Sequence, residues 1–240
     1  MFLRKANLYR TTAAILFAAF SVIAIHAQQP DSAAIIQKVD AAVKARTDGI
    51  ASYTVTEHYA VYRNNDETHP AAEMTVKTTY RKESGKSYAI LSQSGSPILR
   101  NFVLGPLLDH EKEINQPATR QAAFFISANY EMQLQPGGIQ QIDGRDCLAL
   151  AINPKHKAPN LIQGTLWVDA RDYSIVRLEG TASKSPSLLT GPAQVMRQYT
   201  KVSGFAQAAH ARAVSTSPLF GQTVVTIDYR DYAIQLQPAN

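Results

Sequence analysis

The chain has 240 residues, of which 45% are hydrophobic and 18% are charged. Such a length and composition suit one globular domain of roughly 200 residues behind an N-terminal leader. The formal charge of +5 falls to +2 without the leader, because Arg4, Lys5 and Arg10 lie in it and no acidic residue does. The remaining basic residues form no stripe, which argues against a nucleic-acid binder.

The first 27 residues have the organisation of a secretory signal peptide. A basic start is followed by an apolar run from Ala13 to Ile25, and the small residue Ala27 precedes Gln28. An uncleaved membrane anchor is the alternative, but the apolar run is short for a span of about 20 residues. We therefore expect an exported protein with a signal peptide at residues 1–27 and a single domain at residues 28–240.

Cys147 is the only cysteine of the chain. A single cysteine excludes an intramolecular disulfide, and none lies where a lipid-modified cysteine would begin the mature protein, so we expect the protein not to be lipid-anchored itself. Because Cys147 begins an apolar, strand-like run, we expect a buried thiol that behaves as a small hydrophobic side chain.

The mature chain is predicted to begin with an amphipathic helix. Asp31 or Ser32 can cap it, and apolar residues recur at helical spacing from Ala34 to Val43. Gly49 is predicted to end the helix in the left-handed conformation.

Three strands are predicted next, at residues 50–62, 73–81 and 87–92. The first two alternate apolar and polar residues with period two, although Glu57 interrupts the apolar face of the first. Short turns join the strands, so we expect antiparallel neighbours with one wetted face.

Residues 98–130 change to helical spacing, with a break at Gly105-Pro106. The run from His110 to Glu113 is interpreted as a solvated charged segment, and a metal site there is the weaker alternative. Residues 117–128 are predicted to hold another short helix.

Strands resume at Tyr130 and continue almost to the end of the chain. They are predicted at residues 130–135, 147–152, 166–168, 174–178, 195–202, 211–216 and 223–236. The stretch from Gly164 to Gly180 is the clearest hairpin, because two apolar segments flank a short polar loop. The fold class is therefore α+β, a single domain of mostly antiparallel sheet with a few covering helices.

The order of motifs between Asn129 and Gly180 resembles the outer-membrane lipoprotein-sorting proteins with the LolA-like fold. The motifs are Asn129-Tyr130, Asp143-Gly144-Arg145, Asn153-Pro154-Lys155, the segment from Gly164 to Asp169 and the segment from Tyr173 to Gly180; residues 227–232 near the end of the chain fit as well. One departure is the segment after Phe205, where relatives tend to carry a Leu-Pro pair and this chain has Ala206-Gln207.

This resemblance implies an unclosed β half-barrel whose concave face is covered by helices and encloses an apolar cavity. It also implies a periplasmic carrier or binder of acyl chains, of lipidated proteins or of other apolar ligands, with no cofactor. A non-enzymatic module of the same fold, which senses the state of the envelope through a protein partner, is the alternative.

Alternation selects the residues that are candidates for the cavity wall. They are Tyr53, Val55, Tyr59, Met74, Val76, Tyr88 and Ile90, and ordinary core packing is the other interpretation of all of them. Arg177 is a candidate for a polar headgroup, although an ion pair with a neighbouring acidic residue such as Glu179 is favoured. Trp167 has the opposite parity to Leu166 and Val168, so we expect it to shield the outer face.

An enzyme is the least favoured interpretation. The sequence has no Gly-x-Ser-x-Gly, Ser-x-x-Lys or His-Glu-x-x-His motif and no glycine-rich phosphate loop. Glu57 and His58 are adjacent on one strand and must point to opposite faces. We therefore expect neither catalytic residues nor a metal site.

Overall fold

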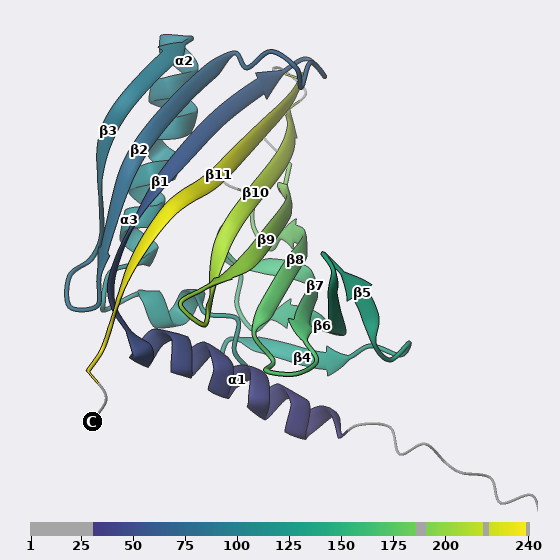
Figure 1. Cartoon of the computed structure of the whole chain (residues 1–240). Helices are drawn as coiled ribbons and strands as arrows, with labels where there is room; N and C mark the ends of the chain where they lie inside the picture. The colour runs from purple at the N-terminus through teal and green to yellow at the C-terminus, as the bar shows by residue number, and fades with distance from the viewer. Residues whose placement is uncertain (1–30, 186–190, 218–220, 239–240) are drawn as a thin grey trace, which may run out of the picture.

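The computed structural model describes residues 31–185, 191–217 and 221–238, and the predicted leader lies outside them. One large antiparallel sheet dominates the molecule, and helices lie against it at two places (Figure 1). Helix α1 crosses beneath the sheet on the side of β4, whereas α2 and α3 lie behind the first three strands.

The elements follow one another in an order close to the predicted one. They are α1 (Ser32–Gly49), β1 (Ile50–Arg63), β2 (Ala72–Arg81), β3 (Gly85–Gly95), α2 (Pro97–Leu99), the π-helix η1 (Arg100–Leu104), α3 (Gly105–Ile114), the 3₁₀ turn η2 (Arg120–Ala123), β4 (Tyr130–Leu134), β5 (Gln140–Ile142), β6 (Arg145–Pro154), β7 (Ile162–Asp169), β8 (Ile175–Ala182), β9 (Gln194–Val202), β10 (Phe205–Ser217) and β11 (Gly221–Leu236).

The strand order is β3-β2-β1-β11-β10-β9-β8-β7-β6-β4, with β5 paired to β6. Neighbouring strands are antiparallel throughout this path. In the described residues the outer strands β3 and β4 do not pair with each other, so the sheet stays open. The α+β fold class with an unclosed half-barrel is confirmed.

The predicted alternation of the first two strands is confirmed. On β2 the side chains of Ala72, Met74, Val76, Thr78 and Tyr80 are buried, whereas the residues between them are partly exposed. The same face of β1 includes Glu57, whose carboxylate is buried rather than wetted. The sheet curves toward the helices, which pack against this concave face (Figure 1).

Helix α1 begins and packs as the sequence predicts. The carboxylate of Asp31 accepts a hydrogen bond from the backbone N–H of Ala33 at 3.0 Å and so caps the first turn. Ile35 and Val39 are buried against residues of β4 and of β6 to β8. The apolar stripe therefore fixes the helix on the concave face near β4.

The predicted left-handed conformation of Gly49 is wrong. Gly49 is the last helical residue, and Ile50 continues directly into β1 with φ −99°. The glycine serves a packing role instead, since a Cβ atom there would lie 2.5 Å from Cζ of Phe205. The Phe205 ring fills the space that the missing side chain leaves.

Gly105-Pro106 does not break the second helical region. The chain runs from α2 through η1 into α3, and the N–H of Gly105 bonds to the carbonyl of Arg100, five residues back. Pro106 has no N–H to donate, and a π-helical turn before it shifts the hydrogen-bond pattern, so the helix continues.

Other predicted boundaries need correction. The helix predicted at residues 117–128 is only the short 3₁₀ turn η2, and β5 was not predicted. Strand β10 begins six residues before the predicted start at Ala211, and β3 extends further at both ends. The alanines and polar residues of β10 carry little strand signal, so its pairing to β9 and β11 decides its length.

The hairpin predicted between Gly164 and Gly180 is confirmed as β7 and β8. Leu166 pairs with Leu178, and Gly164 pairs directly with Gly180. A Cβ atom on Gly164 would lie 2.1 Å from the carbonyl oxygen of Glu179, so the two backbones approach more closely than any side chain would allow. The two glycines at the ends of this stretch are therefore cross-strand neighbours, one on β7 and one on β8.

The thiol of Cys147 is fully buried on β6, and burial raises its pKa to about 11. The predicted role of this residue as a small hydrophobic side chain is confirmed. Of the helices in the described residues, none combines the length and the apolar composition that crossing a bilayer requires.

Candidate functional site

A cavity of about 610 Å³ lies between the concave face of the sheet and the helices. Its walls come from α1, η1, α3 and η2 on one side and from β1, β3 and β7 to β11 on the other. Volumes of 300 to 1,000 Å³ are typical of small-molecule sites. The centre of the half-barrel is therefore hollow.

Most of the wall is apolar. Aliphatic and aromatic side chains contributed by helices, loops and strands include Val103, Leu107, Ile114, Phe124, Ile175 and Val195. The part of the wall formed by β10 consists largely of alanines, namely Ala206, Ala208, Ala211 and Ala213. A methyl group reaches only a short way from the backbone, so this central strand leaves space that longer side chains would fill.

Of the candidate cavity residues, Tyr53 lies in the wall of the cavity. The others lie elsewhere in the described part of the chain: Val55, Tyr59, Met74 and Val76 are buried core, Tyr88 is partly buried, and Ile90 is half exposed on the edge strand. Tyr59, Met74 and Val76 do face the concave side, but Leu104 and Leu108 cover them. Alternation indicates which side chains share a face of the sheet, but it does not indicate which part of that face the helices leave uncovered.

Arg177 lies outside the cavity lining. Its guanidinium pairs with Glu179 at 2.5 Å and with Asp143 at 3.5 Å, and Trp167 is its cross-strand neighbour. The favoured interpretation of an ion pair agrees with this geometry. Trp167 has the opposite parity to the buried Leu166 and Val168 and therefore lies on the outer face as expected.

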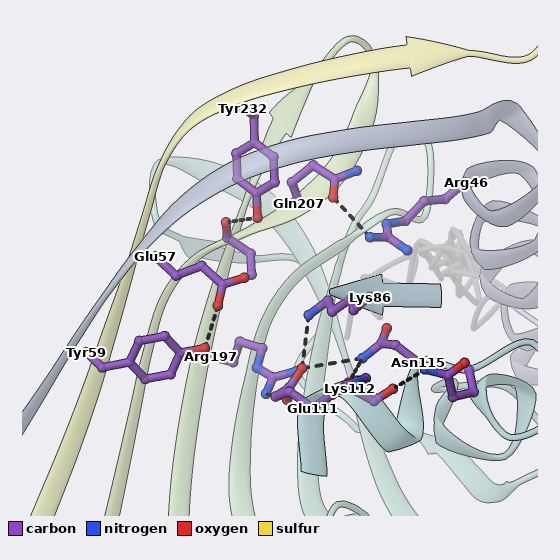
Figure 2. Close-up of polar contacts among 12 residues, drawn as sticks. Arg46, Glu57, Tyr59, Lys86, Glu111, Lys112, Asn115, Arg197, Gln207 and Tyr232 are labelled. Atoms are coloured by element: carbon purple, nitrogen blue, oxygen red, sulfur yellow. Dashed lines mark hydrogen bonds and ion pairs between the residues drawn. The ribbon is translucent and has the colours of Figure 1, made fainter. Parts of the chain in front are cut away.

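A charged cluster on one wall was not predicted. The ammonium of Lys86 lies 3.0 Å from the Glu111 carboxylate, and Arg197 lies 3.9 Å from its other oxygen (Figure 2). Glu111 was interpreted as part of a solvated run, which is wrong for this residue. One turn of α3 points its side chain to the interior, where Lys86 of β3 and Arg197 of β9 meet it.

The three charges hold one another in the ionised state. Burial raises the pKa of Glu111, but Lys86 and Arg197 outweigh it and lower the pKa to about 2. Burial lowers the pKa of Lys86, but the attraction of Glu111 outweighs it and places the pKa well above its ordinary value. The cluster therefore stays charged at neutral pH.

Glu57 supplies a second carboxylate to the same wall. It accepts a short hydrogen bond from the hydroxyl of Tyr59, which stands two residues along β1 on the same face (Figure 2). Burial raises the pKa of Tyr59, so its phenol stays protonated and can donate. The residue that interrupts the apolar pattern of the first strand is thus part of the polar end of the cavity.

A bulge in β11 brings two tyrosines into the cavity. Tyr229 and Tyr232 are three residues apart and would face opposite sides of a regular strand. Between Thr54 and Thr56 the pairing of β1 with β11 shifts by one residue, and Asp231 takes φ 55°. The extra residue turns Tyr232 to the side of Tyr229, where its hydroxyl donates to the carbonyl of Ala208 at 2.9 Å.

Helix α1 is tied to the sheet by polar contacts beside the cavity. Arg46 donates to the carbonyl of Ala206 at 2.8 Å and to the side-chain oxygen of Gln207 at 3.0 Å. At the other end of the helix, Lys38 donates to the hydroxyl of Tyr173 at 3.1 Å. The helix covers the cavity while anchored to β10 and to the β7–β8 hairpin.

The polar groups of the cavity are suited to binding. Among residues 31–185, 191–217 and 221–238, no group of three or more His, Cys, Asp or Glu side chains is arranged to hold a metal ion. His58 and Glu57 point to opposite faces of β1, and the His58 ring lies beside Glu73 and Thr75. The cavity therefore combines a mostly apolar lining with one charged wall formed by Lys86, Glu111 and Arg197.

No protein-family model and no curated protein matches the sequence. Solved structures that the chain is similar to include a LolA superfamily protein from Nitrosomonas europaea, at 15% identity over 86% of this chain and 94% of that chain with a TM-score of 0.45. A putative outer membrane lipoprotein-sorting protein domain from Vibrio parahaemolyticus has 15% identity, covers 87% and 94% and has a TM-score of 0.47. A DUF1329 family protein from Desulfovibrio piger has 15% identity, covers 85% and 95% and has a TM-score of 0.42. The titles of the first two name the family that the sequence resembles. At this identity, none of the three structures assigns a function to any residue of this chain.

Proposed function

We propose that this protein is a non-enzymatic periplasmic carrier or binder that holds the acyl chain of a lipidated protein, or another apolar ligand, in its central cavity. The observation that supports the proposal is the cavity of about 610 Å³ between the sheet and the helices. Each methylene that moves from water into such a site contributes about 0.8 kcal/mol, so a long chain provides a large driving force.

The arrangement of the covering helices supports reversible binding. Helix α1 lies on the sheet through a few buried side chains and a small number of polar contacts, among them those of Arg46 and Lys38. A ligand can enter where such a cover yields, because few contacts must be broken at once. In this proposal, export through the leader places the domain at residues 28–240 in the periplasm.

The first test measures occupancy. Protein purified from the periplasmic fraction without detergent is measured by native mass spectrometry, and its lipids are then extracted and identified. Co-purifying lipid at a stoichiometry near one is expected. An empty protein that also fails to take up a neutral fluorescent probe such as N-phenyl-1-naphthylamine would contradict the proposal, and an empty protein that co-purifies with one protein partner would favour a sensing module.

The second test fills the cavity. Ala213 lines it and pairs with Val195 and Val225, which also line it, so Ala213→Trp places a large ring in the open space. Thr200→Trp adds the same side chain at an exposed position of β9 outside the lining. We expect Ala213→Trp to reduce probe binding at least tenfold and Thr200→Trp to leave it unchanged; equal binding by both variants would contradict the cavity as the binding site.

A further inference from the structure

The cavity wall carries more positive than negative side chains. Among the described lining residues the cations are Arg46, Lys86, Arg120, Arg197 and Arg212, and the anions are Glu57, Glu111 and Asp172. Arg212 is paired with Glu67 and Asp172 with Lys201, so these two charges are balanced by neighbours. An excess of positive charge remains around the interior of the cavity.

The two acidic groups inside the cavity are already engaged. Glu111 is held by Lys86 at 3.0 Å, and Glu57 accepts from the hydroxyl of Tyr59. Arg120 is also committed, since it donates to the hydroxyl of Tyr80 at 3.1 Å and to the carbonyl of Lys82. Arg46 donates to the carbonyl of Ala206 and to Gln207 and has no carboxylate partner in the described residues, and Arg197 lies 3.9 Å from Glu111, so these two cations are the least balanced by carboxylates.

Three buried side-chain nitrogens of the wall have no hydrogen-bond partner among the described residues. They are Nε2 of His110, Nε of Arg197 and Nε2 of Gln207, a residue that is only 1% exposed. The oxygen of the Gln207 amide accepts from Arg46, so its NH₂ group is the unpaired one. Buried donors are almost always hydrogen-bonded in folded proteins, so donors without a protein partner on a cavity wall are free to bond to an acceptor of a ligand or to water.

The donors and the positive charge lie on the wall of the same cavity. Figure 2 shows Arg46 beside the side-chain oxygen of Gln207, and Lys86 and Arg197 together at Glu111. All four line the same cavity, and the apolar part of its wall lies beside them. A ligand can therefore place a polar end on this cluster and a hydrocarbon chain on the aliphatic and aromatic wall.

We propose that the ligand is an amphiphile whose headgroup is an oxyanion, a carboxylate or a phosphate, bound by Arg197 and Gln207 next to Arg46. The proposal rests on the proposed function and specifies the chemical class of the ligand. An oxyanion accepts from both unpaired donors and offsets the excess positive charge, whereas a cationic headgroup would meet Arg46, Lys86 and Arg197. Charge-assisted hydrogen bonds of this kind select the headgroup, and the chain supplies most of the affinity.

The test uses four ligands with the same chain: hexadecanoate, hexadecyl phosphate, hexadecanol and hexadecyltrimethylammonium. Each displaces N-phenyl-1-naphthylamine from the delipidated full-length mature protein at neutral pH, below its micellar concentration. We expect one or both oxyanions to bind at least tenfold more tightly than the alcohol and the ammonium compound to bind most weakly. The tighter of the two oxyanions identifies the carboxylate or the phosphate as the preferred headgroup.

Variants locate the headgroup site. Arg197→Gln is expected to reduce the preference for the oxyanion over the alcohol to less than threefold without changing the affinity for the alcohol, and Gln207→Leu to reduce it partly. Arg177→Gln is the matched control, because this arginine is paired on the outer face and its loss should leave the preference unchanged. Arg197→Lys keeps the charge and provides a second variant if the glutamine variant does not fold, which circular dichroism checks.

The outcomes separate the two proposals. If all four ligands bind equally well, or if Arg197→Gln keeps the full preference, the oxyanion site is wrong while the apolar binding function stands. If none of the four ligands displaces the probe, the binding function itself is wrong and the headgroup site with it.

Discussion

The two ends of the concave face and its centre are built differently. Near β4, Ile35 and Val39 of α1 are seated among fully buried leucines of β6 to β8. Near β3, Leu104 and Leu108 cover Tyr59, Met74 and Val76 in the same way. Between these two packed ends, the strands β9 to β11 carry alanines, tyrosines and Arg197 around open space.

This difference shows how one continuous sheet can hold both a core and a cavity. Packing at the ends provides the apolar burial that stabilises the domain. In the centre, the Lys86–Glu111 ion pair and the hydrogen bond from the Arg46 side chain to the carbonyl of Ala206 connect the walls without filling the space. Substitutions at the ends and in the centre should therefore have separable effects.

The largest expected effect is a difference in unfolding free energy between two valine-to-alanine substitutions, one in a packed end of the sheet and one beside the cavity. Val76 is fully buried at the α3 end, and Val76→Ala should lower the free energy of unfolding by about 2 to 3 kcal/mol through lost burial and a new void. Val195 borders the cavity and is only partly buried, so Val195→Ala should cost about 1 kcal/mol or less. Urea unfolding of both variants measures the difference, and equal losses would show that the centre is packed like the ends.

The next effect concerns the charged wall and its dependence on pH. The pKa of Glu111 is depressed to about 2 from 4.5 in the folded state, so its stabilisation is complete above pH 4.5 and is lost as the pH falls toward 2. Glu111→Gln leaves the partly solvated Lys86 without its carboxylate and should cost about 2 kcal/mol at neutral pH, as expected for loss of a hydrogen bond between charged groups.

The difference in unfolding free energy between the wild type and Glu111→Gln should shrink as the pH is lowered from 5 to 2. Glu179→Gln is the matched control, because its ion pair with Arg177 lies on the outer face and should contribute less than about 1 kcal/mol. A pH-independent difference for Glu111→Gln would contradict the buried ion pair.

The smallest expected effect concerns the bulge that brings Tyr232 into the cavity. Tyr232→Phe removes the hydrogen bond to the carbonyl of Ala208 and should lower the free energy of unfolding by about 1 kcal/mol. Tyr173→Phe is the control: the hydroxyl of Tyr173 accepts from the exposed Lys38, so its removal should change stability by a few tenths of a kcal/mol at most. Equal effects of the two substitutions in thermal unfolding would contradict a role for this hydrogen bond in the cavity wall.

Local patterns in the sequence determined much of the fold. The cap at Asp31, the alternation of β1 and β2, the hairpin between Gly164 and Gly180 and the outward position of Trp167 all follow from periods of 3.6 or two residues and from turn chemistry. These features depend on neighbours within a few residues. They could therefore be predicted from the chain alone.

The cavity was decided by tertiary structure. Lys86, Glu111 and Arg197 lie far apart in the sequence and meet only because β3, α3 and β9 surround one space. Alternation showed that Tyr59, Met74 and Val76 face inward but not that α3 would cover them, and the alanines of β10 gave no strong pattern. Which part of a concave face stays open depends on where the helices come to rest, and that position is set by packing between distant segments.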